Sequence, residues 1–135
     1  MKNLISIDNV FKALVVILLA TMAFGAKAAS VSGNVGLSSD YIFRGQSQTQ
    51  GDSAISGGFD LDAGKGFYLG AWASEVSYAG SDADLELDTY VGWGTDVNGV
   101  SINLSYVDYD YSGDSSLNGS EYQIGLGYEG FSFLH

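Results

Sequence analysis

Apolar and polar residues alternate with a period of two along most of the chain, and this pattern constrains the fold more than any other feature. No apolar run with helical spacing follows Ser30. Alternation with this period indicates strands that have one apolar and one polar face. The sequence therefore predicts an all-β chain with six full strands and the start of a seventh at Phe131. The six lie at 31–44, 55–62, 67–76, 85–93, 100–111 and 121–128.

Two of these segments depart from strict alternation. Residues 67–76 are apolar or small on both faces, so the orientation of this strand stays open. In residues 100–111 the apolar phase slips after Tyr106 to Val107, Tyr109 and Tyr111. Because an extra residue in one strand shifts its phase, we expect a β-bulge near Tyr106.

The connections between the segments alternate in length. Residues 63–66, 96–99 and 129–130 read as tight turns, and Asn98-Gly99 suits a type I′ hairpin. Residues 46–53, 78–84 and 112–119 form longer polar loops. The result is an antiparallel up-and-down meander with all tight turns at one end, which is typical of transmembrane β-barrels of the outer membrane.

The N-terminal residues predict an export signal. Lys2 and Lys12 precede an apolar run at 13–24, and Ala26 and Ala28 fit the small-x-small cleavage pattern. The alternative, a membrane anchor, is disfavoured because about 12 residues reach only roughly 18 Å, short of the ~30 Å hydrocarbon core. We therefore expect a signal peptide at 1–28 and a β-barrel domain at 29–135.

Charge and composition exclude several classes of function. The net charge is -11, from 16 acidic and 5 basic residues, which opposes binding to nucleic acid. The chain has no cysteine, and its one histidine is His135. A catalytic triad and a cysteine or histidine metal site both need residues that are missing here, so we expect no enzyme, metal site or cofactor.

Aromatic residues concentrate at the ends of the expected strands. If the strands cross a bilayer, these residues would form two girdles at the two interfaces. The alternative is a soluble β-sandwich that uses the same aromatics as its core. The girdle candidates are Tyr41, Phe43, Tyr106 and Tyr122 near the long loops, and Phe67, Trp93, Tyr128 and Phe131 near the tight turns.

Acidic residues dominate the polar faces of the same strands. If the apolar faces contact lipid, these side chains line a lumen that favours cations. The alternative is an interior filled by hydrogen-bonded side chains, with no open channel. Arg44 is the only cation among them, and we expect it to pair with Asp40, Asp60 or Glu121. The lumen candidates are Asp40, Arg44, Asp60, Asp62, Glu86, Asp88 and Glu121.

Asp82, Asp84, Glu86 and Asp88 form an acidic run at every second residue. Carboxylate oxygens can hold Ca²⁺, but this spacing lacks the EF-hand loop pattern. We therefore interpret the run as a solvated loop that attracts cations.

Residues 38–49, 56–60 and 66–74, which read SSDYIFRGQSQT, SGGFD and GFYLGAWAS, resemble the TorF family of porins. The resemblance implies an outer-membrane β-barrel with a pore-like role and implies no catalytic residues. Many relatives have a proline where this chain has Asp52-Ser53-Ala54, and they continue through several more strands. Because single-chain bacterial barrels use an even number of at least eight strands, we expect that these residues alone do not close a barrel.

Three functions remain in competition at this point. The first is an outer-membrane porin that passes small hydrophilic solutes by diffusion, with a preference for cations. The second is a non-conducting outer-membrane barrel with a structural or surface-binding role, and the third is a secreted soluble β-sandwich that binds Ca²⁺. The expected partners are outer-membrane lipid and small solutes or cations. The sequence leaves the solute, the pore radius and the oligomeric state open.

Overall fold

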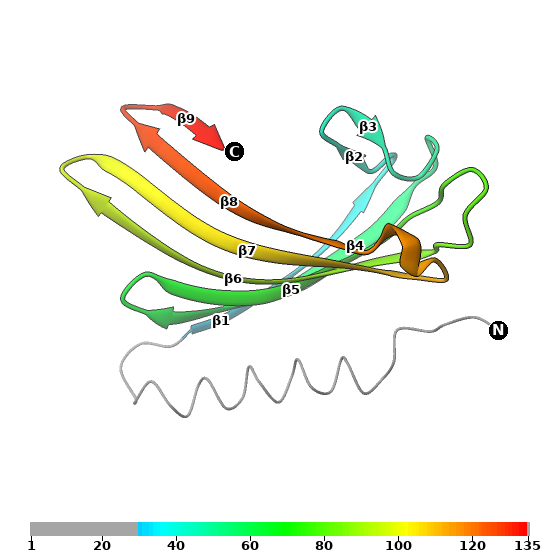
Figure 1. Cartoon of the computed structure of the whole chain (residues 1–135), viewed down its shortest axis with the longest axis horizontal. Helices are drawn as coiled ribbons and strands as arrows, with labels where there is room; N and C mark the ends of the chain where they lie inside the picture. The colour runs from blue at the N-terminus through cyan, green and yellow to red at the C-terminus, as the bar shows by residue number, and fades with distance from the viewer. Residues whose placement is uncertain (1–29, 135) are drawn as a thin grey trace.

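The computed structural model describes residues 30–134, and these form one antiparallel seven-stranded sheet (Figure 1). Its strands are β1 (Ser30–Ser38), β4 (Ala54–Gly64), β5 (Phe67–Glu75), β6 (Leu85–Val97), β7 (Val100–Ser112), β8 (Gly119–Tyr128) and β9 (Phe131–Leu134). Strands of this sheet that follow one another in the chain are paired, in the order β1-β4-β5-β6-β7-β8-β9, which confirms the predicted all-β, up-and-down arrangement.

Two small elements lie outside this sheet. The connection between β1 and β4 contains the hairpin β2 (Ile42–Phe43) and β3 (Gln46–Ser47), and the connection between β7 and β8 contains the 3-10 helix η1 (Ser115–Leu117). Over residues 30–134 the structure contains no helix that is both long and apolar enough to cross a membrane. The predicted signal peptide, with Ala26 and Ala28, lies outside the described residues.

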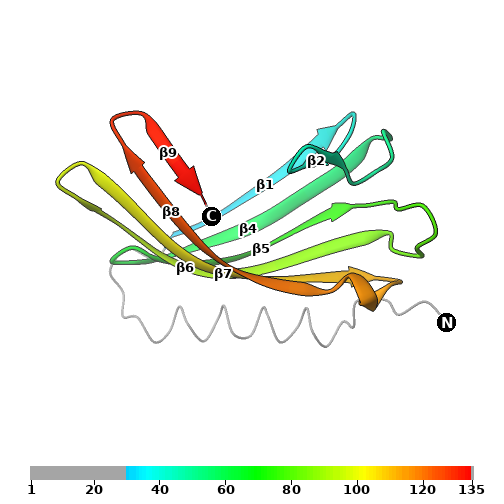
Figure 2. The ribbon, with the colours of Figure 1, turned by 45° about the horizontal axis from the view of Figure 1, so that its top comes forward.

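The sheet is a single, strongly curved layer, and its two edge regions rise on the same side (Figure 2). β1 pairs only with β4, and β9 pairs only with β8, so no closed barrel is seen within the described range. Apart from the short β2–β3 hairpin, no second sheet is present over residues 30–134, so the structure gives the β-sandwich alternative no support.

The connections lie as the sequence predicts. Each of the three tight turns has its two central residues at positive φ, which is the type I′ pattern that matches the twist of paired strands, and in the first turn Gly64 before them also has a positive φ. The central pairs are Lys65-Gly66, Asn98-Gly99 and Glu129-Gly130. The longer connections 39–53, 76–84 and 113–118 lie at the opposite ends of the strands.

The bulge expected near Tyr106 is not present. β7 pairs with β6 residue for residue from Val100 to Ser112 without a register shift, and its pairing with β8 is equally regular. The shift occurs instead between β4 and β5, near Asp62 and Gly64. The phase slip in the sequence arises because Val107, Tyr109 and Tyr111 lie on the polar face, while Asp108 and Asp110 lie on the opposite one.

The first strand is shorter than predicted. β1 ends at Ser38, and residues 39–53 fold as a separate loop with its own hairpin. Arg44 and Gly45 have φ values of 48° and 80°, and this left-handed pair reverses the chain. Asp40, Tyr41, Phe43 and Arg44 therefore do not continue the faces of β1, although the sequence pattern places them there.

Candidate functional site

The strand register divides the sheet into an apolar face and a polar face. One row across the sheet joins Asp60 on β4, Gly70 on β5, Tyr90 on β6, Val107 on β7 and Glu121 on β8. Residues in such a row point to the same side of the sheet. The row two residues along carries Trp72, Asp88 and Tyr109, so polar and aromatic side chains share one face.

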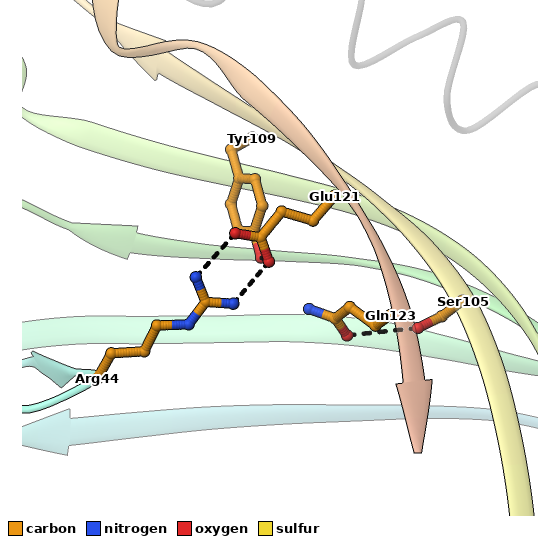
Figure 3. A network of polar contacts seen from close by, with 5 residues as sticks. All are labelled: Arg44, Ser105, Tyr109, Glu121 and Gln123. Carbon is orange, nitrogen blue, oxygen red and sulfur yellow. Dashed lines mark hydrogen bonds and ion pairs between the residues drawn. The ribbon is translucent and has the colours of Figure 1, made fainter. Parts of the chain in front are cut away.

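This polar face is the concave one. Arg44, in the loop between β1 and β4, reaches Glu121 on β8, four strands beyond β4 in the sheet order (Figure 3). Tyr90 on β6 donates its hydroxyl hydrogen to Asp60 on β4, two strands away. Such contacts between non-adjacent strands form where a curved sheet brings its side chains together.

The opposite, convex face is largely apolar and exposed, and its carboxylates, Glu75, Asp108 and Asp110, lie towards the long-loop end. Val35, Tyr122 and Phe131 each leave more than four fifths of their surface uncovered. The register also settles the orientation of β5, because Phe67, Leu69, Ala71 and Ala73 share the convex face with Val91 and Leu87. The large exposed side chains of this face are Val31, Val35, Leu37, Ile55, Phe59, Phe67, Val91, Val97, Leu104, Tyr122, Ile124, Leu126, Tyr128, Phe131 and Phe133.

Tyrosine hydroxyls on the concave side donate to the acceptors of this face. Tyr41 donates to Glu86 at 3.0 Å, and Tyr109 lies 3.4 Å from Glu121. Tyr68 donates to the side-chain oxygen of Asn103 at 3.0 Å. These bonds orient the rings and satisfy part of the acceptor capacity of the carboxylates.

Glu86 and Asp88 form the most enclosed acidic pair. Both lie on the concave face of β6, and Glu86 is only 3% exposed. Asp88 Oδ1 is buried and has no hydrogen-bond partner among the described residues. Burial, followed by the Glu86 carboxylate, raises the pKa of the Tyr41 phenol far above its usual range, so Tyr41 remains a hydrogen-bond donor.

The ion pair between Arg44 and Glu121 is bidentate, with N–O distances of 2.8 and 2.7 Å (Figure 3). Glu121 is one of the three partners expected from the sequence. Asp40 lies elsewhere, since it accepts hydrogen bonds from the hydroxyls of Ser47 and Thr49. The Arg44 guanidinium also lies 4.8 Å from the centre of the Phe43 ring.

Six of the eight girdle candidates lie on the convex face of the sheet. Tyr106 and Tyr122 form a ring pair with centroids 5.1 Å apart, and Phe67 and Trp93 form another at 6.5 Å. Tyr128 stands opposite Phe131 beside the last tight turn.

The other two girdle candidates lie elsewhere. Tyr41 packs edge-on against Trp72 at 5.4 Å on the concave side, and Phe43 lies in the β2–β3 hairpin.

The sequence reasoning missed Tyr68, Trp72, Tyr109 and Tyr111 as residues of the polar face. The signal that could have found them is parity. Tyr109 and Tyr111 have the parity of Ser101, Asn103 and Ser105 on the same strand.

The acidic loops form local hydrogen bonds. Ser112 donates to Asp84, and Asp114 accepts from the hydroxyls of Ser81 and Ser116 at 2.8 and 2.5 Å. Asp82 and Asp84 lie just before β6, while Asp60 and Asp62 lie on β4. No group of three or more histidine, aspartate or glutamate side chains in residues 30–134 is arranged to hold a metal ion.

The bonds to Asp114 predict a pH effect in this loop. Hydrogen bonds from Ser116 and Ser81 hold the pKa of Asp114 below its usual value of 3.8. A lowered pKa in the folded state gives stabilisation that is present above the usual pKa and is lost as the pH falls through the lowered one. An NMR titration of the Asp114 carboxyl should therefore have a midpoint below 3.8, and Ser81→Ala should move it upward. A midpoint that Ser81→Ala leaves unchanged would contradict this assignment.

Comparisons with known proteins give one match. Neither the curated proteins nor the solved structures contain a match to this chain. Residues 22–133 match the sequence model of a family described as bacterial protein of unknown function (Gcw_chp). This range covers most of the chain and every strand from β1 to β8. The chain therefore belongs to the Gcw_chp family.

Proposed function

We propose that this chain forms the wall of an outer-membrane β-barrel through which small hydrophilic solutes diffuse, with a preference for cations. The observation that carries the proposal is the contrast between the two faces of one curved sheet. The convex face exposes large apolar side chains, and the concave face carries carboxylates and tyrosines. A barrel wall that separates lipid from an aqueous lumen has this distribution.

The convex face fits a lipid environment. Soluble monomeric proteins rarely expose contiguous apolar patches larger than a few hundred Å². In this protein, exposed large apolar side chains of the convex face occur on all seven strands of the sheet. β6 and β7 each have 13 residues. At ~3.3 Å per residue and a tilt near 45°, such a strand rises about 30 Å, enough to cross an apolar band of roughly 25 Å.

The concave face fits a passage for cations. Arg44 is paired with Glu121, and the other basic residue of the described range, Lys65, lies in a tight turn. Asp60 and Asp62 therefore line the hollow without a basic side chain to balance them in residues 30–134, while Glu86 and Asp88 lie enclosed on the same face. A low-dielectric wall of one sign of charge concentrates counter-ions.

The resemblance of residues 38–49, 56–60 and 66–74 to the TorF porins supports the same proposal, while membership of the Gcw_chp family assigns no activity. In analogy with barrels of this architecture, the tight turns would face the periplasm and the loops 39–53, 76–84 and 113–118 would face outward.

The second candidate is a barrel whose interior is filled and does not conduct. The rings of Tyr68 and Tyr90 project over the concave face, and their hydroxyls bond to side chains two strands away. Loop 39–53 also reaches across this face to Glu121. A barrel of this kind would have a structural or surface-binding role.

Bilayer recordings across a KCl gradient separate the two candidates. We expect a reversal potential of the sign for cation selectivity, and a smaller one at high salt, because salt screens the lumen charges. The double substitution Asp60→Asn and Asp62→Asn should reduce the selectivity, while Glu129→Gln in a tight turn should leave it unchanged. Anion selectivity would refute the face assignment, and absence of conductance from a barrel that has closed would favour the filled barrel.

A further inference from the structure

We propose that loop 39–53 acts as a size-selecting strap across the mouth of the passage, and that the ion pair between Arg44 and Glu121 is its latch. The inference rests on the proposed function, since a size limit requires a passage. Its structural basis is a contrast between the two parts of the loop. The base, residues 40–41 and 47–49, is firmly anchored, whereas the tip, Arg44-Gly45, is held by the ion pair.

The base of the strap is closed by internal hydrogen bonds. Ser47 donates its hydroxyl hydrogen to the Asp40 carboxylate at 2.6 Å, and the main-chain N–H of Gln48 donates to the main-chain carbonyl of Tyr41 at 2.7 Å. The Tyr41 amide donates to the hydroxyl of Thr49, which is only 2% exposed. These bonds fix where the loop leaves β1 and returns to β4.

The base is also tied to the sheet and to the neighbouring loop. Tyr41 bonds to Glu86 on β6 and packs against Trp72 on β5. The Ser77 amide donates to the Gln48 carbonyl, and the Tyr78 hydroxyl donates to the Gln48 side chain, both at 2.8 Å. Several anchors on three elements hold the base in place.

The tip is held differently. Arg44 reaches Glu121 across the hollow, and the side chains of the two residues are 62% and 34% exposed. A Cβ added at Gly45, beside Arg44, would meet nothing within 4 Å, so the turn itself is unpacked. Exposed ion pairs contribute about 0–1 kcal/mol, a bidentate pair such as this one lies at the upper end, and both weaken with salt. The tip can therefore detach when this one contact breaks, while the several contacts of the base keep the base in place.

The position of the latch decides what the strap can do. The loop starts from β1 and returns to β4, whereas Glu121 lies on β8, near the opposite edge of the sheet (Figure 3). With the pair formed, a side chain bridges the concave face near the long-loop end. With the pair broken, that bridge is gone and larger solutes can enter.

A distance measurement tests the latch without reference to conduction. The chain has no cysteine, so labels at Gln46→Cys and Ser120→Cys report the separation of strap tip and β8 in the full-length protein. We expect a narrow distance distribution at about 0.1 M salt, and a broad one for Arg44→Gln or at about 1 M salt, where screening is far stronger. The exchanged pair, Arg44→Glu with Glu121→Arg, should restore the narrow distribution, and Lys65→Gln should have no effect. An unchanged distribution in Arg44→Gln would overturn the latch.

Permeation of tetraalkylammonium ions of increasing size tests the size limit. Arg44→Gln and Glu121→Gln should raise the permeability of the larger ions relative to K⁺ several-fold, and the exchanged pair should return it to the original value. If the variants conduct with an unchanged size limit, the strap is refuted as a size selector. If neither the original protein nor any variant conducts, the proposed function fails, and the label distances still decide whether the latch exists.

Discussion

Replacing Leu104 with arginine should lower the equilibrium constant for membrane insertion by roughly 30- to 700-fold, because a charged side chain on the lipid face of a barrel costs roughly 2–4 kcal/mol near the middle of the bilayer. Leu104 is exposed on the convex face of β7, between the Tyr106–Tyr122 ring pair and the residue pair Tyr128–Phe131. Folding titrations in urea, in the presence of lipid vesicles, measure this loss.

Ser105→Arg is the matched control, because Ser105 is the next residue of the same strand and lies on the concave face opposite Gln123. It should leave insertion nearly unchanged, since an arginine there enters the aqueous side. If the two variants insert equally well, the convex face does not contact lipid, and the membrane proposal is wrong.

The sequence predicts the sheet well because the alternation of apolar and polar residues within each strand shows which residues share a face. In residues 85–93 the apolar Leu85, Leu87 and Val91 alternate with Glu86 and Asp88, and the structure places the two sets on opposite faces of β6. Tight turns are also local, since Asn98-Gly99 alone favours the two positive φ values that are observed. Order and direction of the strands follow from these two signals.

The bulge prediction fails because Val107 is buried on the polar face and because tyrosine was counted as apolar. Tyr109 and Tyr111 have apolar rings, yet the hydroxyl of Tyr109 lies beside Glu121 on the next strand. The tyrosine hydroxyl forms its hydrogen bond with a residue of another strand. The alternation of residues along a single strand gives no information about such a contact. The ladder is therefore regular where the hydrophobic pattern slips.

The first loop fails for a related reason. Alternation continues through Tyr41 and Phe43, so the sequence extends the strand to Arg44, whereas β1 ends at Ser38. The bonds that fold the loop come from Ser47, Gln48 and Thr49 further along the chain. The partner of Arg44 lies 77 residues away. The positive charge of Arg44 limits its possible partners to a few acidic residues. Only the curvature of the sheet, which the sequence does not show, brings Glu121 close to it.

Addition of one methyl group at Gly92 is the second substitution with a large expected effect. Gly92 on β6 stands opposite Tyr68 on β5, and a Cβ at Gly92 would overlap the Tyr68 ring, well inside van der Waals contact. Two residues along, Tyr90 covers Gly70 in the same way, so each strand supplies the space that the ring of the other needs. Gly92→Ala must displace the Tyr68 ring and break its hydrogen bond to Asn103.

We expect Gly92→Ala to lower the free energy of unfolding by roughly 1–3 kcal/mol, the usual cost of overpacking. Gly94→Ala, on the same face of β6, is the control, because its Cβ would approach no atom closer than 3.4 Å. A double-mutant cycle with Tyr68→Ser then identifies the cause. If the ring is the obstacle, the two substitutions together cost less than the sum of their separate effects, because the serine leaves room for the methyl group. If the effects simply add, or if Gly94→Ala is equally harmful, glycine is needed at these positions for the backbone, and the tyrosine rings do not set the spacing of the concave wall.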